Sequence, residues 1–103
     1  YLFTVDYTSG GTKGLLKDGG SKRKAVVEKM AAKLGGKIEA FYFCFGKADA
    51  IVIADLPDNV TAAAVSLAVS ETGTGAMVTT PLLTVEEVDK ACKKSVGYKA
   101  PGA

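Results

Sequence analysis

The sequence contains no histidine, only one arginine, two cysteines and no long apolar run. Without an imidazole there is no histidine base, no histidine-activated serine or cysteine nucleophile, and no histidine-ligated zinc or haem. Because no run approaches about 18 apolar residues, we expect no membrane contact. The two cysteines, Cys44 and Cys92, are too few for a disulfide framework. They are interpreted as buried, reduced thiols of a cytoplasmic protein.

Charge and length narrow the range of partners and architectures. A net charge of +2 over 103 residues provides no basic field, so we expect no nucleic-acid partner. A chain of this length, with 48% hydrophobic residues, predicts a single domain over residues 1–103, of which 98–103 form a C-terminal tail.

The most informative stretch is a predicted hairpin formed by residues 38–45 and 50–54, separated by a break at 46–49. In the first run, one parity includes Ile38 and Tyr42, and the other carries Phe41, Phe43 and Phe45. Neither parity is polar, whereas a strand with one solvated face alternates apolar and polar residues. A sheet built around this hairpin must therefore be covered on both faces.

The remaining elements surround this hairpin. Glycine-rich residues 8–20 are predicted to form a flexible connection with at most one helical turn. The predicted helices begin at the cap residues Ser21, Asp58 and Thr84, and the other two predicted strands span 2–7 and 76–83. The helix after Ser21 ends at Gly35-Gly36, and the last helix runs to Gly97. The order β-α-β-β-α-β plus a terminal helix predicts an α+β, ferredoxin-like fold with a four-stranded antiparallel sheet.

In a ferredoxin-like fold both crossover helices pack on one face of the sheet, and the other face stays open. Because the hairpin is apolar on both faces, we expect a second subunit to close the open face. The result would be a dimeric α/β barrel that encloses a small cavity. In the alternative, the last helix and the tail fold across that face.

A cation cluster, Lys22-Arg23-Lys24, occupies the first turn of the helix that follows Ser21. Positive charge is unfavourable at a helix N-terminus unless an anion binds the free N–H groups and the cations together. The planar guanidinium of Arg23 suits a carboxylate or a phosphate. We therefore predict a small-anion site near Arg23, with Lys13 of the glycine-rich segment as a further contact. The alternative is a solvated helix start.

Tyr42 is the residue most like a catalytic acid, because a nearby cation such as Arg23 or Lys13 would ease loss of its proton. Asp49 is the second acid or base candidate, and both residues are also predicted ligand contacts. In the alternative, Tyr42 is a core residue with a hydrogen-bonded hydroxyl.

The carboxylates Glu39 and Asp55 depend on the hairpin register. With a tight turn centred on 47–48, Ala40 faces Asp55 and Glu39 points to the opposite face, whereas a one-residue slip would bring both acids to one face. No calcium-loop spacing is present, so we expect neither a metal ion nor another cofactor.

Seven stretches of the chain form a further pattern: Tyr7-Thr8 and Lys13, Ser21-Lys22-Arg23, Leu34–Lys37, Glu39–Tyr42, Gly46 and Asp49, Leu56–Asn59, and Leu82–Val88. In these stretches the chain resembles the GYD domain family of small bacterial proteins. The resemblance implies a ferredoxin-like fold that associates through its sheet, and it implies no activity. Two departures are Ala48, where the family motif has a tyrosine, and the lack of a basic residue near Val78.

The sequence thus leads to three hypotheses of function. The first is an oligomeric protein that binds a small, partly apolar anion through Lys13, Arg23, Tyr42 and Asp49. The second is a cofactor-independent isomerase or monooxygenase with Tyr42 or Asp49 as acid or base, which rests on analogy between folds. The third is a structural assembly module without a ligand.

Overall fold

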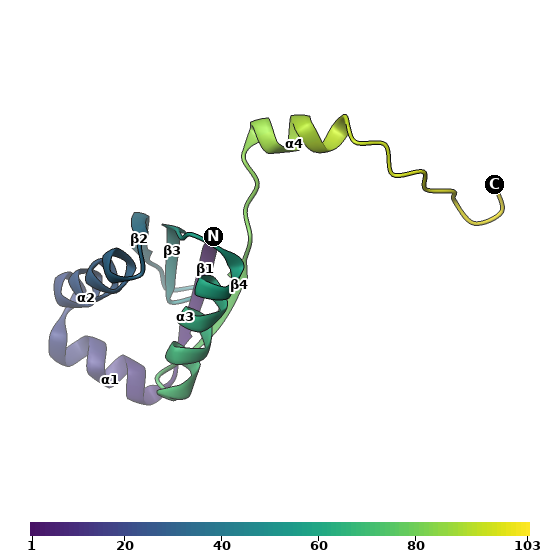
Figure 1. Ribbon diagram of the computed structural model, residues 1–103. Coiled ribbons are helices and arrows are strands. Elements are labelled where there is room, and N and C mark those ends of the chain that lie inside the picture. The colour runs from purple at the N-terminus through teal and green to yellow at the C-terminus, as the bar shows by residue number, and fades with distance from the viewer.

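The computed structural model describes residues 1–103 as four strands and four helices (Figure 1). In chain order they are β1 (Leu2–Tyr7), α1 (Ser9–Asp18), α2 (Gly20–Lys33), β2 (Lys37–Phe43), β3 (Ala50–Asp55), α3 (Asn59–Glu71), β4 (Gly75–Thr80) and α4 (Val85–Cys92). The strands form one open antiparallel sheet in the order β2-β3-β1-β4. The predicted α+β class and four-stranded antiparallel sheet are confirmed.

Two helices cover one face of this sheet. The helix α2 packs over β2 and α3 over β4, so each lies above an outer strand (Figure 1). The core between them consists of Phe3, Val52, Ala54, Leu56, Ala62 and Val65. Only 12 of the 103 residues are buried, and none of them is polar. This core is small for a chain of this length, so much apolar side-chain surface stays in contact with solvent.

The glycine-rich segment forms the helix α1 and is not the flexible connection that its composition predicted. Thr8 caps it, with its Oγ1 accepting a hydrogen bond from Gly11 N at 3.3 Å. A Cβ at Gly11 would lie 1.9 Å from the carbonyl oxygen of Thr74. Glycine is therefore required here for close packing, although it lowers helix propensity. The predicted Ser21 cap is also wrong, because α2 begins at Gly20 after Gly19, with φ of 80° and no side-chain cap.

The hairpin differs from its predicted register. The loop spans residues 44–49, and a bulge interrupts the pairing between Ile38 and Ala40. Lys37 lies opposite Asp55 and Ala40 lies opposite Ile53, so the expected pairing of Ala40 with Asp55 is wrong. An extra residue in one strand reverses the facing of the side chains beyond it. Ile38 consequently packs toward the helices, whereas the sequence parity placed it with Tyr42 on the other face.

Two of the three predicted helix caps are confirmed. Asp58 Oδ1 accepts a hydrogen bond from Thr61 N at 2.8 Å, and this bond holds the pKa of the Asp58 carboxyl below its usual value. Thr84 forms a capping box with Glu87 at the start of α4.

The end of β4 at Thr80, before Pro81, is earlier than predicted, because proline cannot donate to the strand pairing. The helix α4 likewise ends at Cys92 and does not reach Gly97.

The cysteines differ in exposure. Cys44 lies in the loop after β2, and not within a strand, with its Sγ 3.0 Å from the carbonyl oxygen of Ala48. It is half-buried, whereas Cys92 is exposed at the end of α4, so the predicted burial of Cys92 is wrong.

Residues 81–103 form what we call the C-terminal arm. Every residue of the arm is exposed, and no hydrogen bond joins it to residues 1–80. Figure 1 shows α4 standing away from the sheet. The sheet face opposite α2 and α3, here called the open face, is therefore not covered by the last helix. None of the helices is long and apolar enough to cross a membrane.

The contrast between two glycines of α1 tests this packing. We expect Gly11→Ala to lower the free energy of unfolding by about 1–3 kcal/mol, because the new methyl group would overlap the backbone at Thr74. At Gly14 no atom lies within 4 Å of the point that a Cβ would occupy, so Gly14→Ala should raise stability by up to about 1 kcal/mol. Urea unfolding of both variants measures the difference, and equal midpoints would contradict the close approach.

Candidate functional site

An apolar cavity of about 80 Å³ lies between the sheet and the helices α2 and α3. Because each helix lies over an outer strand, the cavity sits above the central strands β1 and β3. Two of the β3 side chains that line the cavity, Ala50 and Ala54, are small. The lining comprises Phe3, Val5, Tyr7, Arg23, Val27, Met30, Ala31, Ile38, Phe41, Ala50, Val52, Ala54, Leu56, Val65, Val69, Thr74, Gly75 and Met77.

Arg23 is the one charged residue in this lining. It lies in the first turn of α2, as the sequence predicted, and is half-buried. The chain contains a single ion pair, between Lys22 Nζ and Asp18 Oδ1 at 3.5 Å, so the guanidinium of Arg23 has no carboxylate partner. A partly desolvated cation without a partner attracts an anion, and a guanidinium can bind a carboxylate through two parallel hydrogen bonds.

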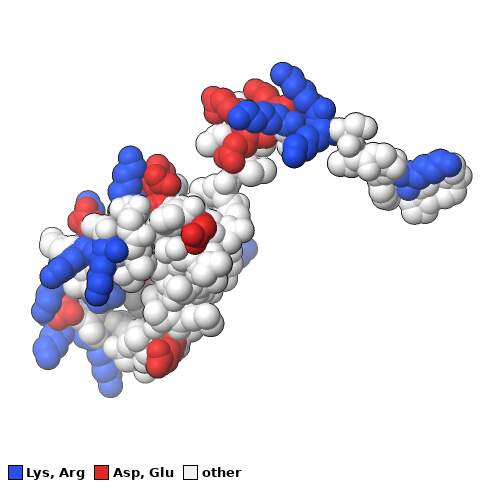
Figure 2. Space-filling view, viewed as in Figure 1, with Lys and Arg blue, Asp and Glu red and all other residues white.

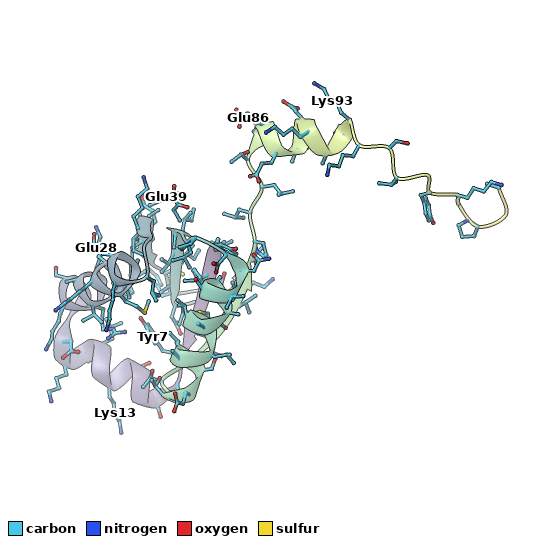
Figure 3. The ribbon with its side chains drawn as sticks, viewed as in Figure 1. Tyr7, Lys13, Glu28, Glu39, Glu86 and Lys93 are labelled. Carbon is cyan, nitrogen blue, oxygen red and sulfur yellow. The ribbon has the colours of Figure 1, made fainter.

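A second hollow, of about 90 Å³, adjoins the cavity beside α1. It is lined by Tyr7, Gly10, Gly11, Gly14, Leu15, Asp18, Arg23 and Thr74. Tyr7, Arg23 and Thr74 belong to both linings, and Tyr7 lies on the inner side of the helices (Figure 3). Arg23 therefore stands where the apolar cavity meets a more polar hollow against the glycines of α1.

The other predicted site residues are not assembled around Arg23. Lys13 projects from α1 into solvent (Figure 3). Tyr42 lies on the open face, opposite Ile51, and its side chain is 69% exposed. Its hydroxyl makes no hydrogen bond within the chain, so the alternative interpretation of Tyr42 as a core residue is wrong. Of the four predicted ligand contacts, only Arg23 lines the cavity.

Asp49 holds the hairpin loop onto the neighbouring strand. Its Oδ2 accepts a hydrogen bond from Tyr7 N at 2.7 Å, and its backbone N–H donates to the carbonyl oxygen of Val5 at 2.9 Å. Its own carbonyl accepts from Cys44 N at 2.9 Å. The carboxylate of Asp49 therefore helps to hold the hairpin loop against β1. Elsewhere, no cluster of three or more cysteine or carboxylate side chains is suited to a metal ion.

Several lining residues were missed as site residues from the sequence. Val27 and Met30 have the helical spacing of inward-facing residues, but that spacing does not distinguish a cavity lining from a packed core. Val69 and Met77 also face the cavity, but only the folded arrangement of α3 and β4 reveals it. Thr74 follows a glycine turn and had no sequence signal at all.

The family model of the GYD domain matches residues 1–92 of the 103-residue chain. The chain belongs to the GYD domain family. No curated protein and no solved structure matches it significantly. The GYD match includes the whole sheet, the cavity lining and α4, and it leaves residues 93–103 outside.

The GYD motif region of this chain lies in the loop between β2 and β3. Ala48, at the position where the resemblance placed a tyrosine, is buried at 7% exposure. Its carbonyl oxygen accepts the contact from the thiol of Cys44. The aspartate of the motif, Asp49, keeps its hydrogen bond to β1. In this GYD protein the loop is therefore fixed by backbone contacts that do not require an aromatic ring at position 48.

Asp49→Ala should lower the free energy of unfolding by about 1–3 kcal/mol, because the half-buried Tyr7 N–H would lose its acceptor. The matched control is Asp55→Ala, since Asp55 is exposed at the end of β3 and its side chain makes no hydrogen bond. That control should change stability by less than about 0.5 kcal/mol. Urea titrations provide both values, and an unchanged midpoint for Asp49→Ala would refute the structural assignment.

Proposed function

We propose that this GYD-domain protein binds a small, partly apolar anion, and that it works as a ferredoxin-like dimer paired through the open face. The anionic group would pair with the guanidinium of Arg23, and the apolar part would occupy the cavity above the central strands. The single observation that carries this proposal is an unpaired arginine in an otherwise uncharged cavity lining.

The cavity limits the chemical class of the ligand. Its volume of about 80 Å³ is well below the roughly 300–1,000 Å³ of pockets that take drug-sized molecules. Since a water-sized group needs about 10–15 Å³ by such a measure, the space suits about five to eight groups of that size. Because the lining contains a single cation, it favours a ligand with a single negative charge. These properties favour a short-chain or branched monocarboxylate over a nucleotide or a sugar phosphate.

The positive charge of the surface around the cavity also favours an anionic ligand. Figure 2 shows lysine and arginine side chains gathered over α1 and α2, the helix before Arg23 and the helix that contains it. Lys13, Lys22 and Lys24 belong to this region and would raise the local concentration of anions by long-range attraction. In this proposal Lys13 attracts the ligand without contacting it.

Arg23→Ala should weaken binding of a monocarboxylate by about tenfold to a hundredfold, because hydrogen bonds to charged groups contribute about 1.5–3 kcal/mol. Thermal-shift titrations with butyrate, isovalerate and hexanoate measure the loss. The matched control is Lys24→Ala, which removes the next cation in the sequence, an exposed one, and should leave binding nearly unchanged.

Two comparisons separate charge recognition from cavity filling. Isoamyl alcohol, the neutral analogue of isovalerate, should bind weakly and equally to the wild-type chain and to Arg23→Ala. Ala54→Val narrows the cavity without touching Arg23 and should weaken the acid and the alcohol alike. The absence of stabilisation of the wild-type chain by every acid would rule out this ligand class.

The open face supports the proposed pairing. It carries Ile51, Val78 and Tyr42, which are 37%, 61% and 69% exposed, and no helix of the chain covers them. Apolar side chains grouped on one face are uncommon on monomers of soluble proteins. A second copy packed sheet to sheet would bury them and would form a dimeric α/β barrel.

Ile51→Lys should weaken dimerisation by at least about tenfold, since it places a charge opposite Thr4 and Tyr42 at the centre of the open face. Val26→Lys is the matched control, because Val26 has similar exposure but lies on α2. Light scattering over a concentration series measures both. A wild-type chain that stays at its monomer mass of 10.6 kDa at high concentration would refute the pairing.

A further inference from the structure

The helix α3 has an outer surface unlike that of α2. Between Asn59 and Ser70 it contains no charged residue, and its Val60 and Leu67 side chains are 79% and 72% exposed. The helix α2, at the opposite edge of the sheet, carries six charged side chains (Lys22, Arg23, Lys24, Glu28, Lys29, Lys33). Figure 2 shows the same contrast, with few charged side chains over α3 and many over α1 and α2. A surface helix normally presents polar or charged side chains to solvent, so exposed apolar side chains on α3 favour a packing partner.

A groove of about 370 Å³ runs along this uncharged surface. It is lined by Tyr1, Asn59, Ala62, Ala63, Ser66, Leu67, Thr79 and Pro81. The alanines and serine of α3 are small enough for another helix to approach closely. Thr79 Oγ1 is buried in this lining without a hydrogen-bond partner. A buried hydroxyl without a partner is costly, so the groove is incomplete in the isolated chain.

The C-terminal arm carries a complementary surface. Val85, Val88 and Cys92 recur at helical spacing along α4, and all three are exposed. The side chains of Glu86 in α4 and of Lys93, the residue just after α4, extend into solvent (Figure 3). A helix of eight residues is marginal in water even with its capping box, and it needs a surface to pack against.

We propose that α4 of one copy docks in the α3–β4 groove of a second copy, so that two chains exchange their arms. The groove extends along α3 from Asn59 to Leu67, about 13 Å at 1.5 Å per residue, and α4 is about 12 Å long. Because α3 has no charge in this region, docking the apolar side of α4 buries neither a carboxylate nor an ammonium group there.

The direction of the arm selects a second copy as the occupant. Pro81, the first residue of the arm, lines the groove, and the chain continues without regular structure to the extended N-cap Thr84, whose ψ is 162°. This segment carries α4 away from the groove of its own chain (Figure 1). Reciprocal exchange about a two-fold axis fills both grooves with one kind of contact. It uses the helix side of the sheet, so it does not depend on the ligand or on pairing through the open face.

Disulfide trapping between two tagged forms of the full chain tests this exchange. Both forms carry Cys44→Ala and Cys92→Ser. One form adds Val88→Cys at the middle of α4, and the other adds Ala63→Cys at the middle of the groove. Paired midpoints meet whichever way the helix lies. After mild oxidation we expect a crosslinked heterodimer on a non-reducing gel.

The matched control replaces Ala63→Cys with Lys29→Cys on the charged surface of α2. We expect at least about tenfold less heterodimer from this pair, since a contact of about 1.4 kcal/mol already gives that ratio. Equal yields from Lys29→Cys and Ala63→Cys would overturn the proposal.

A chain that carries both Val88→Cys and Ala63→Cys separates exchange from folding back. Exchange gives crosslinked dimers, whereas a monomer with an internal disulfide would overturn the proposal. Adding Ile51→Lys to both forms should leave the trapped heterodimer in place. Failure of the open-face pairing and failure of the arm exchange are therefore distinguishable.

Discussion

The position of two helices over the outer strands is the constraint from which the rest of the molecule follows. With α2 above β2 and α3 above β4, the central strands β1 and β3 lie beneath neither helix. The apolar side chains there surround a space that the chain does not fill. The same two-layer arrangement leaves the opposite face of the sheet uncovered. The position of the two helices therefore accounts for both the internal cavity and the exposed apolar face.

The class of fold followed from the sequence because periodicity and cap residues are local signals. Asp58 and the Thr84–Glu87 pair identified helix starts from the side chains that satisfy free backbone N–H groups. The helix α1 could not be predicted in this way, because Gly11 is required by a carbonyl more than sixty residues further along the chain. The bulge beside Ala40 could not be predicted either, because it appears only in the pairing of β2 with β3 and not in the alternation within β2.

The candidate site, like the fold, could be predicted from the sequence only in part. The cation cluster led to Arg23 as a predicted anion contact, and the structure places Arg23 in the cavity lining as its one charged residue. Tyr42 and Asp49 were grouped with it as polar residues of the hairpin that were expected to lie near this helix. The sheet separates Tyr42 onto its other face, and Asp49 has a backbone partner in Tyr7. Residue chemistry thus suggested the proposed type of ligand, whereas the topology of the sheet decided which residues line the cavity.

The bulge in β2 has a consequence for the exposed edge of the sheet. An edge strand with regular, unpaired N–H and C=O groups is a template on which further chains can add and grow into fibres. In β2 the bulge between Ile38 and Ala40 breaks that regular repeat, and the charged Lys37 and Glu39 lie beside it. Uncontrolled strand addition at this rim is therefore disfavoured, although the chain leaves much apolar surface exposed elsewhere.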